Sequence, residues 1–133
     1  MTSLVVWDRE TLGKHRDDVL DVYAEAMAVT QTVARSRRPI ITAHLERRGL
    51  RTIAAIDDDE QVVGIAYGYL GSRGQWWHDQ VRAALSDSDA ARWLDGAFEV
   101  CELHVRPARQ GGGLGRLLLD ALLDGPPAPT ASL

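Results

Sequence analysis

The hydrophobic pattern at the start of the chain changes from that of a strand to that of a helix. Residues 3–7, SLVVW, form a short apolar run that is typical of a β-strand. From Thr11 onward, apolar residues recur at steps of three and four, and acidic residues occupy positions between them. This spacing predicts an amphipathic helix over residues 11–30, with one face buried and the other in solvent.

The next segment is polar and basic, and it separates two predicted helices. Residues 31–39, QTVARSRRP, lack a regular apolar spacing, so we expect a loop there. Residues 40–49, IITAHLERRG, are expected to form the second helix. Pro39 lies near its first turn, where a missing N–H is tolerated, and Gly49 marks its C-terminal stop.

The middle of the chain has the pattern of a hairpin followed by a helical insertion. Two β-rich runs flank an acidic turn at residues 57–60. A tryptophan-containing stretch then shows helical spacing in two pieces, broken around residues 86–88. The predicted elements from here on are strands at 52–56 and 61–70, helical pieces at 75–85 and 89–94, a strand at 97–105 and a helix at 114–123. This order indicates an α/β or α+β domain.

Composition and charge narrow the class of protein. With 133 residues, of which 45% are hydrophobic and 26% charged, the chain is long enough for one domain with its own core. The formal net charge of −4 gives no electrostatic reason to expect nucleic-acid or membrane binding. The single cysteine, Cys101, cannot form an internal disulfide, and neither a membrane span nor a signal peptide is recognisable. We therefore expect a cytoplasmic protein.

Four glycines stand between the last long strand and the leucine-rich helix. A strand that opens into a helix through glycines forms an anion site, because the first-turn N–H groups are unpaired and a phosphate can approach them closely. A plain turn is the alternative. The loop lacks the Gly-Lys-Ser/Thr of nucleoside triphosphatases, and the dinucleotide fingerprint would need glycine where the chain has Arg116. The glycines are Gly111, Gly112, Gly113 and Gly115.

Residues 105–115, VRPARQGGGLG, resemble the acetyl-CoA loop of the GCN5-related N-acetyltransferase (GNAT) superfamily. The family pattern is V-x-P-x-x-(Arg/Gln)-G-x-G-(Ile/Leu)-G, preceded by a strand that ends in Leu-x-Val and followed by a leucine-rich helix. Every defined position matches, with Gln110 in the Arg/Gln slot. The order of elements also matches the first two thirds of the family's domain. The resemblance implies a mixed, mostly antiparallel sheet flanked by helices, with acetyl-CoA as the cofactor.

In this family the amides of the loop hold the pyrophosphate of acetyl-CoA, and an arginine such as Arg116 lies close to the phosphates. Backbone groups of Leu103 and Val105 are expected to pair with the extended pantetheine arm, and a strand amide near Val105 to polarise the acetyl carbonyl. The cofactor-binding residues implied by the resemblance are Leu103, Val105, Gln110, Gly111, Gly112, Gly113, Leu114, Gly115 and Arg116.

The chemistry of the family is direct attack of an amine on a thioester, and a substrate ammonium must first lose a proton. Related enzymes often use a carboxylate on the fourth strand, so Glu99 and Glu102 are the catalytic candidates. Glu99 resembles the position of the base in histone-type members and ranks first. Strand alternation puts the two glutamates on opposite faces. The residues expected on the face of Glu99 are Cys101, Leu103 and Val105. A solvated or salt-bridged strand residue is the alternative for either glutamate.

Other reactive side chains have structural explanations beside the functional ones. Cys101 has two interpretations, an acetyl-accepting nucleophile and a small buried apolar residue. His104 is expected on the face of Glu102, and its structural interpretation is a histidine with satisfied hydrogen bonds. A concentration of arginines over residues 35–51 has two interpretations. It attracts an acidic substrate or the cofactor's 3′-phosphate, or it is a solvated face of the protein. The tryptophans of the insertion line an acceptor pocket or pack a helix on the sheet. The other histidines show no metal-ligand spacing, so we expect no metal. The arginines of the basic cluster are Arg35, Arg37, Arg38, Arg47, Arg48 and Arg51. The tryptophans are Trp76, Trp77 and Trp93, and the other histidines are His15, His44 and His78.

The family pattern reaches the last residues of the chain, but the C-terminal third of a typical domain is not matched. A typical member continues with a fifth strand that splays from the fourth, a helix carrying a tyrosine acid, and two further strands. Residues 129–133, PTASL, are expected to begin the fifth strand, and none of Tyr23, Tyr67 and Tyr69 occupies the acid's motif. We expect a single GNAT-like domain over residues 1–133 with an open sheet edge. A shortened enzyme, strand exchange in a homo-oligomer and a degenerate binding domain are the open explanations.

The leading function is transfer of an acetyl group from acetyl-CoA to the amine of a small molecule or peptide, with no nucleic-acid or membrane partner. The alternative is a non-catalytic acyl-CoA-binding or protein-interaction module of the same fold. Substitution of Glu99 separates the two, because a catalytic base lowers turnover without weakening cofactor binding, whereas a binding module has no turnover to lose.

Overall fold

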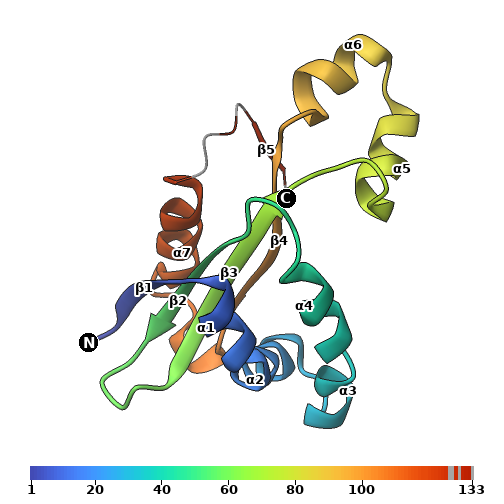
Figure 1. Ribbon diagram of the computed structural model, residues 1–133. Coiled ribbons are helices and arrows are strands. Elements are labelled where there is room, and N and C mark those ends of the chain that lie inside the picture. Colours follow the sequence, from blue (N-terminus) through green and yellow to red (C-terminus); the bar gives the residue numbers. More distant parts are fainter. Residues whose placement is uncertain (126–127, 129, 133) are drawn as a thin grey trace.

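A five-stranded sheet forms the centre of the protein (Figure 1), for which a computed structural model describes residues 1–125, 128 and 130–132. The strands lie in the order β1-β2-β3-β4-β5. The first four are antiparallel, whereas β5 runs parallel to β4. The strands are β1 (Ser3–Trp7), β2 (Arg51–Ile56), β3 (Val62–Leu70), β4 (Phe98–Val105) and β5 (Ala131–Ser132). The predicted mixed, mostly antiparallel sheet is confirmed.

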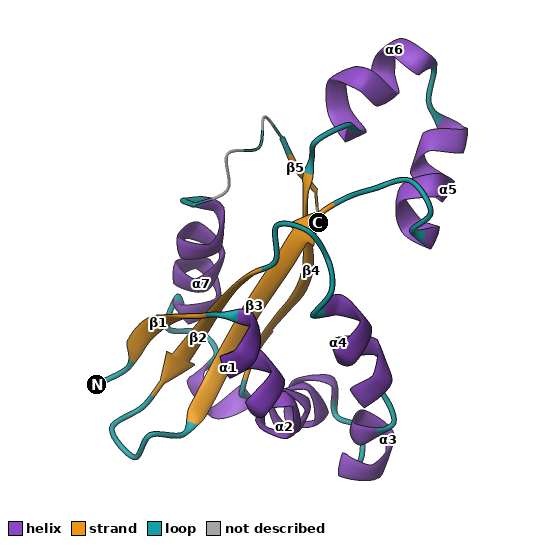
Figure 2. Cartoon of the chain, in the orientation of Figure 1, coloured by secondary structure: helices purple, strands orange, loops and turns teal. Residues whose placement is uncertain are grey.

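Helices cover both faces of this sheet (Figure 2). Helix α2 packs on β3 and β4, and α7 packs on β2, β3 and β4 from the opposite side, so that two apolar cores form. The helices are α1 (Arg9–Lys14), α2 (Arg16–Met27), α3 (Gln31–Arg35), α4 (Arg38–His44), α5 (Trp76–Ala84), α6 (Asp87–Asp89) and α7 (Leu114–Leu123), with a π-helical turn η1 (Ala90–Leu94) and a 3-10 turn η2 (Pro107–Arg109). Within the described ranges, no helix combines the length and apolar character needed to cross a membrane.

The single helix predicted over residues 11–30 is two helices, α1 and α2, separated at His15. The backbone of His15, with φ −104° and ψ 20°, leaves the helical region between them. Its ring stacks on Trp7 with 4.6 Å between centroids, and its Nδ1 lies 2.8 Å from Oδ2 of Asp18. Because Trp7 belongs to β1, the apolar spacing of the helical segment gave no sign of this break.

The loop predicted over residues 31–39 is also wrong, because α3 and the start of α4 lie there. The Thr30 hydroxyl accepts a hydrogen bond from the Val33 amide at 3.2 Å and caps α3, and Ala34 is buried. Pro39 does lie in the first turn of α4. This helix ends at His44, before Gly49, whose φ is +73° and whose Cβ would lie 2.6 Å from the Leu70 side chain.

The insertion between β3 and β4 is helical in two parts, as predicted, and it extends beyond the end of the sheet (Figure 1). The Ser86 hydroxyl accepts from the Asp89 amide at 3.1 Å and starts the second part. Trp76 and Trp77 are 75% and 40% exposed, and Trp93 is exposed as well. The tryptophans therefore do not anchor the insertion on the sheet.

A β-bulge in β4 changes which residues share a face of the sheet. Tyr67 of β3 pairs with Glu102, but the next residue, Gly68, pairs with Val100, so Cys101 is an extra residue in β4. Cys101 consequently packs in the core beside α2, whereas Val100 and its neighbours along that face pack in the core beside α7. The prediction from simple alternation fails at this point, because alternation assumes an uninterrupted ladder.

Candidate active site

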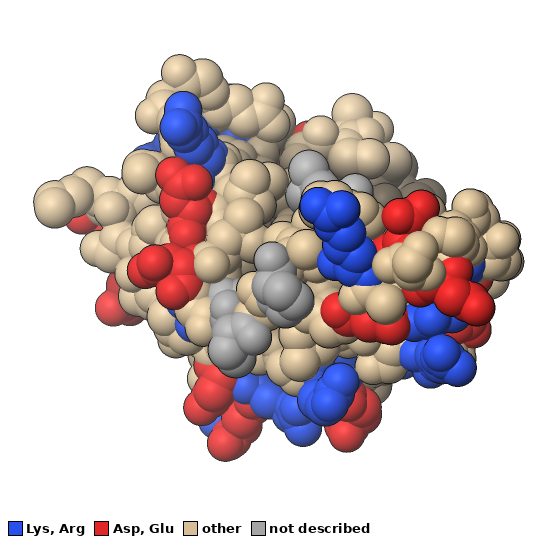
Figure 3. All heavy atoms as spheres, turned by 90° about the horizontal axis from the view of Figure 1, so that it is seen from above, with Lys and Arg blue, Asp and Glu red and all other residues tan. Residues whose placement is uncertain are grey.

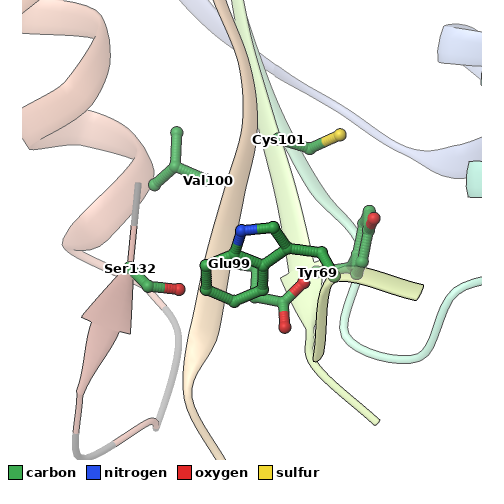
Figure 4. A pocket seen from close by; sticks show the side chains of 6 residues that line it. Tyr69, Glu99, Val100, Cys101 and Ser132 are labelled. Atoms are coloured by element: carbon green, nitrogen blue, oxygen red, sulfur yellow. The ribbon is translucent and has the colours of Figure 1, made fainter. Parts of the chain in front are cut away.

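Glu99 is a buried carboxylate at the wall of a cavity between the sheet and the insertion. It pairs across the sheet with Tyr69 and is only 7% exposed. The cavity has a volume of about 220 Å³. Figure 4 shows the Glu99 and Tyr69 side chains on its wall and Val100 pointing toward the α7 side. The lining residues are Tyr69, Trp77, Glu99, Val100, Cys101 and Ser132.

The carboxylate of Glu99 faces the imidazole of His78, which α5 brings to it. Nδ1 of His78 lies 3.6 Å from Oε1 of Glu99, and His78 is 2% exposed. Within the described part of the chain, neither atom has a hydrogen-bond partner. A Cβ on Gly71 would lie 2.1 Å from Oε1 of Glu99 and 3.0 Å from Nδ1 of His78. Glycine at this position therefore leaves the space in which the two side chains meet.

The pKa of Glu99 is raised above its ordinary value of 4.5. Burial is the main cause, since it disfavours the charged form, while His78 and the more distant charge of Arg47 act in the opposite direction. A carboxyl group in this environment holds a proton more readily than a solvent-exposed glutamate, which suits proton transfer from an amine.

Glu102 has a different environment and is held by an ion pair with Arg37 and a hydrogen bond with His104. Its Oε1 accepts from Nη2 of Arg37 at 3.3 Å, and its Oε2 lies 2.5 Å from Nε2 of His104. His104 in turn meets the ring of Tyr23 edge-on, with 5.2 Å between centroids. The bulge turns Glu102 toward α2 and α4, onto the same side of the sheet as Glu99, so the prediction that the two glutamates lie on opposite faces is wrong.

The predicted neighbours of Glu99 are only partly correct for the same reason. Cys101 lines the cavity together with Glu99, as expected. Leu103 and Val105, expected on this face, instead pack with α7. One extra residue in the strand inverts the alternation that follows it.

A cluster of polar aromatic residues beside the cavity was not predicted from the sequence. The Tyr67 hydroxyl lies 2.8 Å from Nδ1 of His44, and Sγ of Cys101 lies 3.7 Å from the same nitrogen. Arg47 lies over the ring of Tyr69, 5.6 Å from its centroid. The signal for this cluster was the spacing of Tyr67 and Tyr69, which puts both on one face of a strand.

Burial raises the pKa of both tyrosines, so their hydroxyl groups stay protonated and remain hydrogen-bond donors. Burial, reinforced by the charge of Glu102, raises the pKa of the Cys101 thiol to about 11. A protonated thiol is a poor nucleophile, which favours the interpretation of Cys101 as a small buried residue.

The glycine loop follows β4 and leads into α7, as predicted. Gly111 and Gly113 have φ values of +85° and +84°, which favour glycine. Gly112 has no such φ, and a Cβ there would meet no heavy atom within 4 Å. Neither the backbone nor the packing of the protein requires glycine at position 112, and the space beside its amide is open.

The first turn of α7 offers unpaired amides next to this loop. The helix begins after Gly113 without a side-chain cap and without an acidic residue in its first turn. The amides of Leu114, Gly115 and Arg116 therefore have no acceptor within the helix and carry its positive end. The amide of Gln110 differs, because it donates to the Pro107 carbonyl at 3.2 Å. The side chain of Gln110 donates to the Val105 carbonyl at 2.9 Å and braces the loop.

The edge of β4 that faces away from β3 is mostly free. Among the described residues, β5 pairs with β4 only at Phe98 and Glu99. Beyond this short contact, the backbone of Leu103 and Val105 is available to an extended ligand. Because of the bulge, Glu99 and Val105 lie opposite Tyr69 and Gly64, which are five residues apart on β3. They are therefore separated by roughly 17 Å, at ~3.3 Å for each strand residue. A single strand thus connects the cavity with the glycine loop.

The basic residues are dispersed rather than gathered at this site. Arg35 and Arg38 contact Asp21 and Asp17, and Arg51 donates to carbonyl oxygens at the end of α7. Acidic and basic side chains are interspersed on the face of the molecule around the insertion (Figure 3). Within the described ranges, no group of three or more histidine, cysteine or acidic side chains is arranged to hold a metal ion.

A curated protein of Mycobacterium tuberculosis (strain H37Rv), described as a GCN5-like protein acetyltransferase, resembles the chain in sequence. The two are 34% identical over 134 aligned positions, which cover 81% of this chain and 65% of that protein. The chain therefore spans slightly less than two thirds of the relative's length. No family model matches the chain.

Solved structures of acetyltransferases share the fold. An aminoglycoside acetyltransferase from an uncultured soil metagenomic sample has a TM-score of 0.66 at 15% identity, with 100% of this chain and 78% of that chain covered. PaiA N-acetyltransferase of Thermoplasma acidophilum, solved in complex with coenzyme A, has a TM-score of 0.55 at 10% identity, with 93% and 70% covered. The glycine-loop motif, the sheet and the curated relative agree, and in all three the chain resembles the GCN5-related N-acetyltransferase (GNAT) superfamily.

Proposed function

We propose that the protein transfers an acetyl group from acetyl-CoA to a primary amine. The observation that carries this proposal is the arrangement along β4, where a buried carboxylate and a phosphate-sized set of open amides lie at the two ends of one exposed strand edge. The residues 1–133 then act as one GNAT-like domain. The curated relative's description as a protein acetyltransferase makes a peptide amine one candidate acceptor.

The residues of the loop fit a CoA pyrophosphate. The glycines at 111–113 leave open space, and the uncapped start of α7 supplies amide donors and a positive dipole. The exposed side chain of Arg116 reaches the phosphates from the first turn. The backbone edge at Leu103 and Val105 pairs with the pantetheine arm. When bound, acetyl-CoA supplies the acetyl group already activated as a thioester.

Glu99 acts as the general base in this proposal. An ammonium group has no lone pair, so the acceptor becomes a nucleophile only after its proton moves to a base. The carboxyl group of Glu99 lines the cavity and accepts that proton there, while its buried Oε1 faces Nδ1 of His78. The ion pair of Glu102 with Arg37 and its hydrogen bond with His104 favour a structural role for Glu102.

Calorimetric titration with acetyl-CoA, desulfo-CoA and ATP tests the cofactor part of the proposal. Saturable binding of both CoA compounds and much weaker binding of ATP are the expected results. A folded chain that binds neither CoA compound would refute the proposal.

An acetyl-transfer assay with a panel of primary amines then tests catalysis, with Glu99→Gln as the variant. Loss of turnover with unchanged acetyl-CoA affinity is expected. Acetyl-CoA binding without turnover on any amine would instead support the non-catalytic acyl-CoA-binding module.

A further inference from the structure

Two consecutive residues of α5 contribute to the cavity in different ways. His78 turns inward and is buried against the carboxylate of Glu99 and the backbone of Gly71. Trp77 stays partly exposed and lines the cavity wall. Trp76, directly before them, is 75% exposed and does not line this cavity. The inward turn of His78 thus fixes α5 over Glu99 and gives Trp77 its place in the wall.

We infer that α5 builds the acceptor side of the site, and that the cavity beside Glu99 admits a primary ammonium carried on a narrow apolar stem. This inference rests on the proposed function and adds the class of acceptor to it. Trp77 is the specificity-determining residue that packs against the stem, and His78 is a positioning residue that holds Glu99.

The charge at the cavity favours a cationic head group. Among the lining residues named above, Glu99 is the acidic one, and its side chain is 10% exposed. A carboxylate largely removed from water is costly, and an ammonium group in the cavity supplies a hydrogen-bond donor with the opposite charge. The Arg47 guanidinium is held over the ring of Tyr69. An anionic head group would face the Glu99 carboxylate at close range.

The size and lining of the cavity favour a narrow stem. Its volume is about 220 Å³, and much of its wall is formed by Trp77, Val100 and the ring of Tyr69. An apolar cavity of about 150 Å³ accommodates benzene, so this one accepts an unbranched alkyl chain or a single ring. A lysine side chain and a free alkylamine both have this chemistry, since each carries an ammonium on a methylene stem.

Equilibrium binding of simple ligands tests the inference without relying on turnover. Calorimetry with the protein, with and without added CoA, would compare n-pentylamine with n-pentanol and pentanoate, which share the stem and differ in the head group. Binding of the amine at least about tenfold tighter than that of the alcohol is expected, because the amine makes a charge-assisted hydrogen bond. Equal or tighter binding of the alcohol or the acid would overturn the inference.

The stem is tested with a series of amines from ethylamine to hexylamine. Affinity is expected to rise about fourfold for each added methylene until the cavity is filled. The substitution Trp77→Ala should flatten this dependence, whereas the matched control Trp76→Ala should leave it unchanged. If both variants keep the dependence, or both lose it equally, Trp77 does not line the acceptor site.

The positioning role of His78 is tested with His78→Asn and His78→Ala in the acetyl-transfer assay. Loss of kcat with little change in acetyl-CoA affinity, partly restored in the asparagine variant, is expected, together with a shifted acid limb in the pH profile. Equal activity of the wild type and both variants would exclude this role.

The source of the amine is decided by comparing n-butylamine with a short peptide that contains one lysine. Acetylation of either supports the inferred stem, and the preferred substrate identifies its source. If amines bind as expected but acetyl-CoA does not, the proposed function fails while the cavity assignment stands. If acetyl-CoA binds and only branched or anionic acceptors are used, the cavity assignment fails while the proposed function stands.

Discussion

In the proposed mechanism, Glu99 combines a functional requirement with a cost in stability. Its carboxyl group is removed from water, and the nearest partner, His78, lies 3.6 Å away, beyond a normal hydrogen bond. At neutral pH the charged form is disfavoured by this burial. Such groups persist where their reactivity is needed, because a base that holds its proton moderately well is suited to take one from an amine.

The substitution Glu99→Gln is therefore expected to separate stability from activity. Turnover should fall by about 100-fold or more if the carboxylate is the general base. The melting temperature at pH 8 should rise, since the buried charge is removed. Glu102→Gln is the matched control. It breaks the pairs with Arg37 and His104, so it should lower the free energy of unfolding by about 1–2 kcal/mol. Thermal melts and steady-state kinetics of both variants provide the test, and a lower melting temperature for Glu99→Gln would contradict it.

The raised pKa of Glu99 also predicts a pH dependence of activity and stability. The groups that face Glu99 are His78 from α5, Tyr69 from β3, Cys101 from β4 and the more distant Arg47. The acid limb of kcat/KM should lie above the ordinary glutamate value of 4.5, because the protonated acid cannot accept a proton. A group whose pKa is raised on folding contributes stability below its unfolded pKa and loses it as pH rises through the folded value. Relative to Glu99→Gln, the wild type should lose stability over that range, which melts at successive pH values would measure.

At the level of elements, substitutions in the glycine loop can separate the effect of backbone strain on stability from the effect of an added side chain on acetyl-CoA binding. Gly113 and Gly74 both have positive φ values, and at neither position would an added Cβ have a heavy atom within 4 Å. Gly113→Ala and Gly74→Ala should each cost about 1 kcal/mol in stability. Only Gly113→Ala should also weaken acetyl-CoA binding, since Gly74 lies in the loop before α5. Gly112→Ala should weaken binding with little effect on stability. Calorimetry and chemical denaturation of the three variants test this, and equal loss of affinity in all three would contradict it.

The C-terminal end of α7 is held by a side chain from β2. Nε and Nη2 of Arg51 donate to the carbonyl oxygens of Leu122 and Ala121 at 3.1 Å and 3.0 Å. These bonds satisfy carbonyls that the helix leaves unpaired and place a positive charge at its negative end. Arg51→Met should lower the free energy of unfolding by about 1–2 kcal/mol and leave acetyl-CoA affinity unchanged. Urea denaturation measures the first effect, and a stability equal to that of the wild type would contradict the role of Arg51.

The elements that the sequence predicted correctly are those whose signals are local. The bounds of α7 agree with the prediction, because a leucine-rich helical spacing follows directly after the glycines. The strands were located to within a residue or so by runs of β-rich residues between turn signals. The break at His15 and the bulge at Cys101 depend on contacts with other strands. Local periodicity contains no information on such contacts, so the shared side of Glu99 and Glu102 could not be predicted from it.

On the scale of the whole molecule, the glycine loop and the cavity lie on different sides of the sheet. The α7 side carries the glycine loop and the core that supports it, and the opposite side carries the cavity and its polar cluster. The insertion extends beyond the end of the sheet, and one of its helices supplies Trp77 to the cavity wall and His78 to the carboxylate of Glu99. Neither the tryptophans nor the histidine could be assigned from sequence spacing, since their partners lie on β3 and β4.

The extra residue at Cys101 has a consequence for how this site can diversify. The extra residue reverses the orientation of the side chains beyond it. Leu103 and Val105 therefore pack with α7 beside the glycine loop, while Glu99 and Cys101 face the cavity proposed for the acceptor. Mutations that alter acceptor choice can thus accumulate at Trp77 and Tyr69 without disturbing residues 105–115. Proteins descended from a common ancestor with this one are expected to retain the glycine loop and to differ in the inserted helix when their acceptors differ.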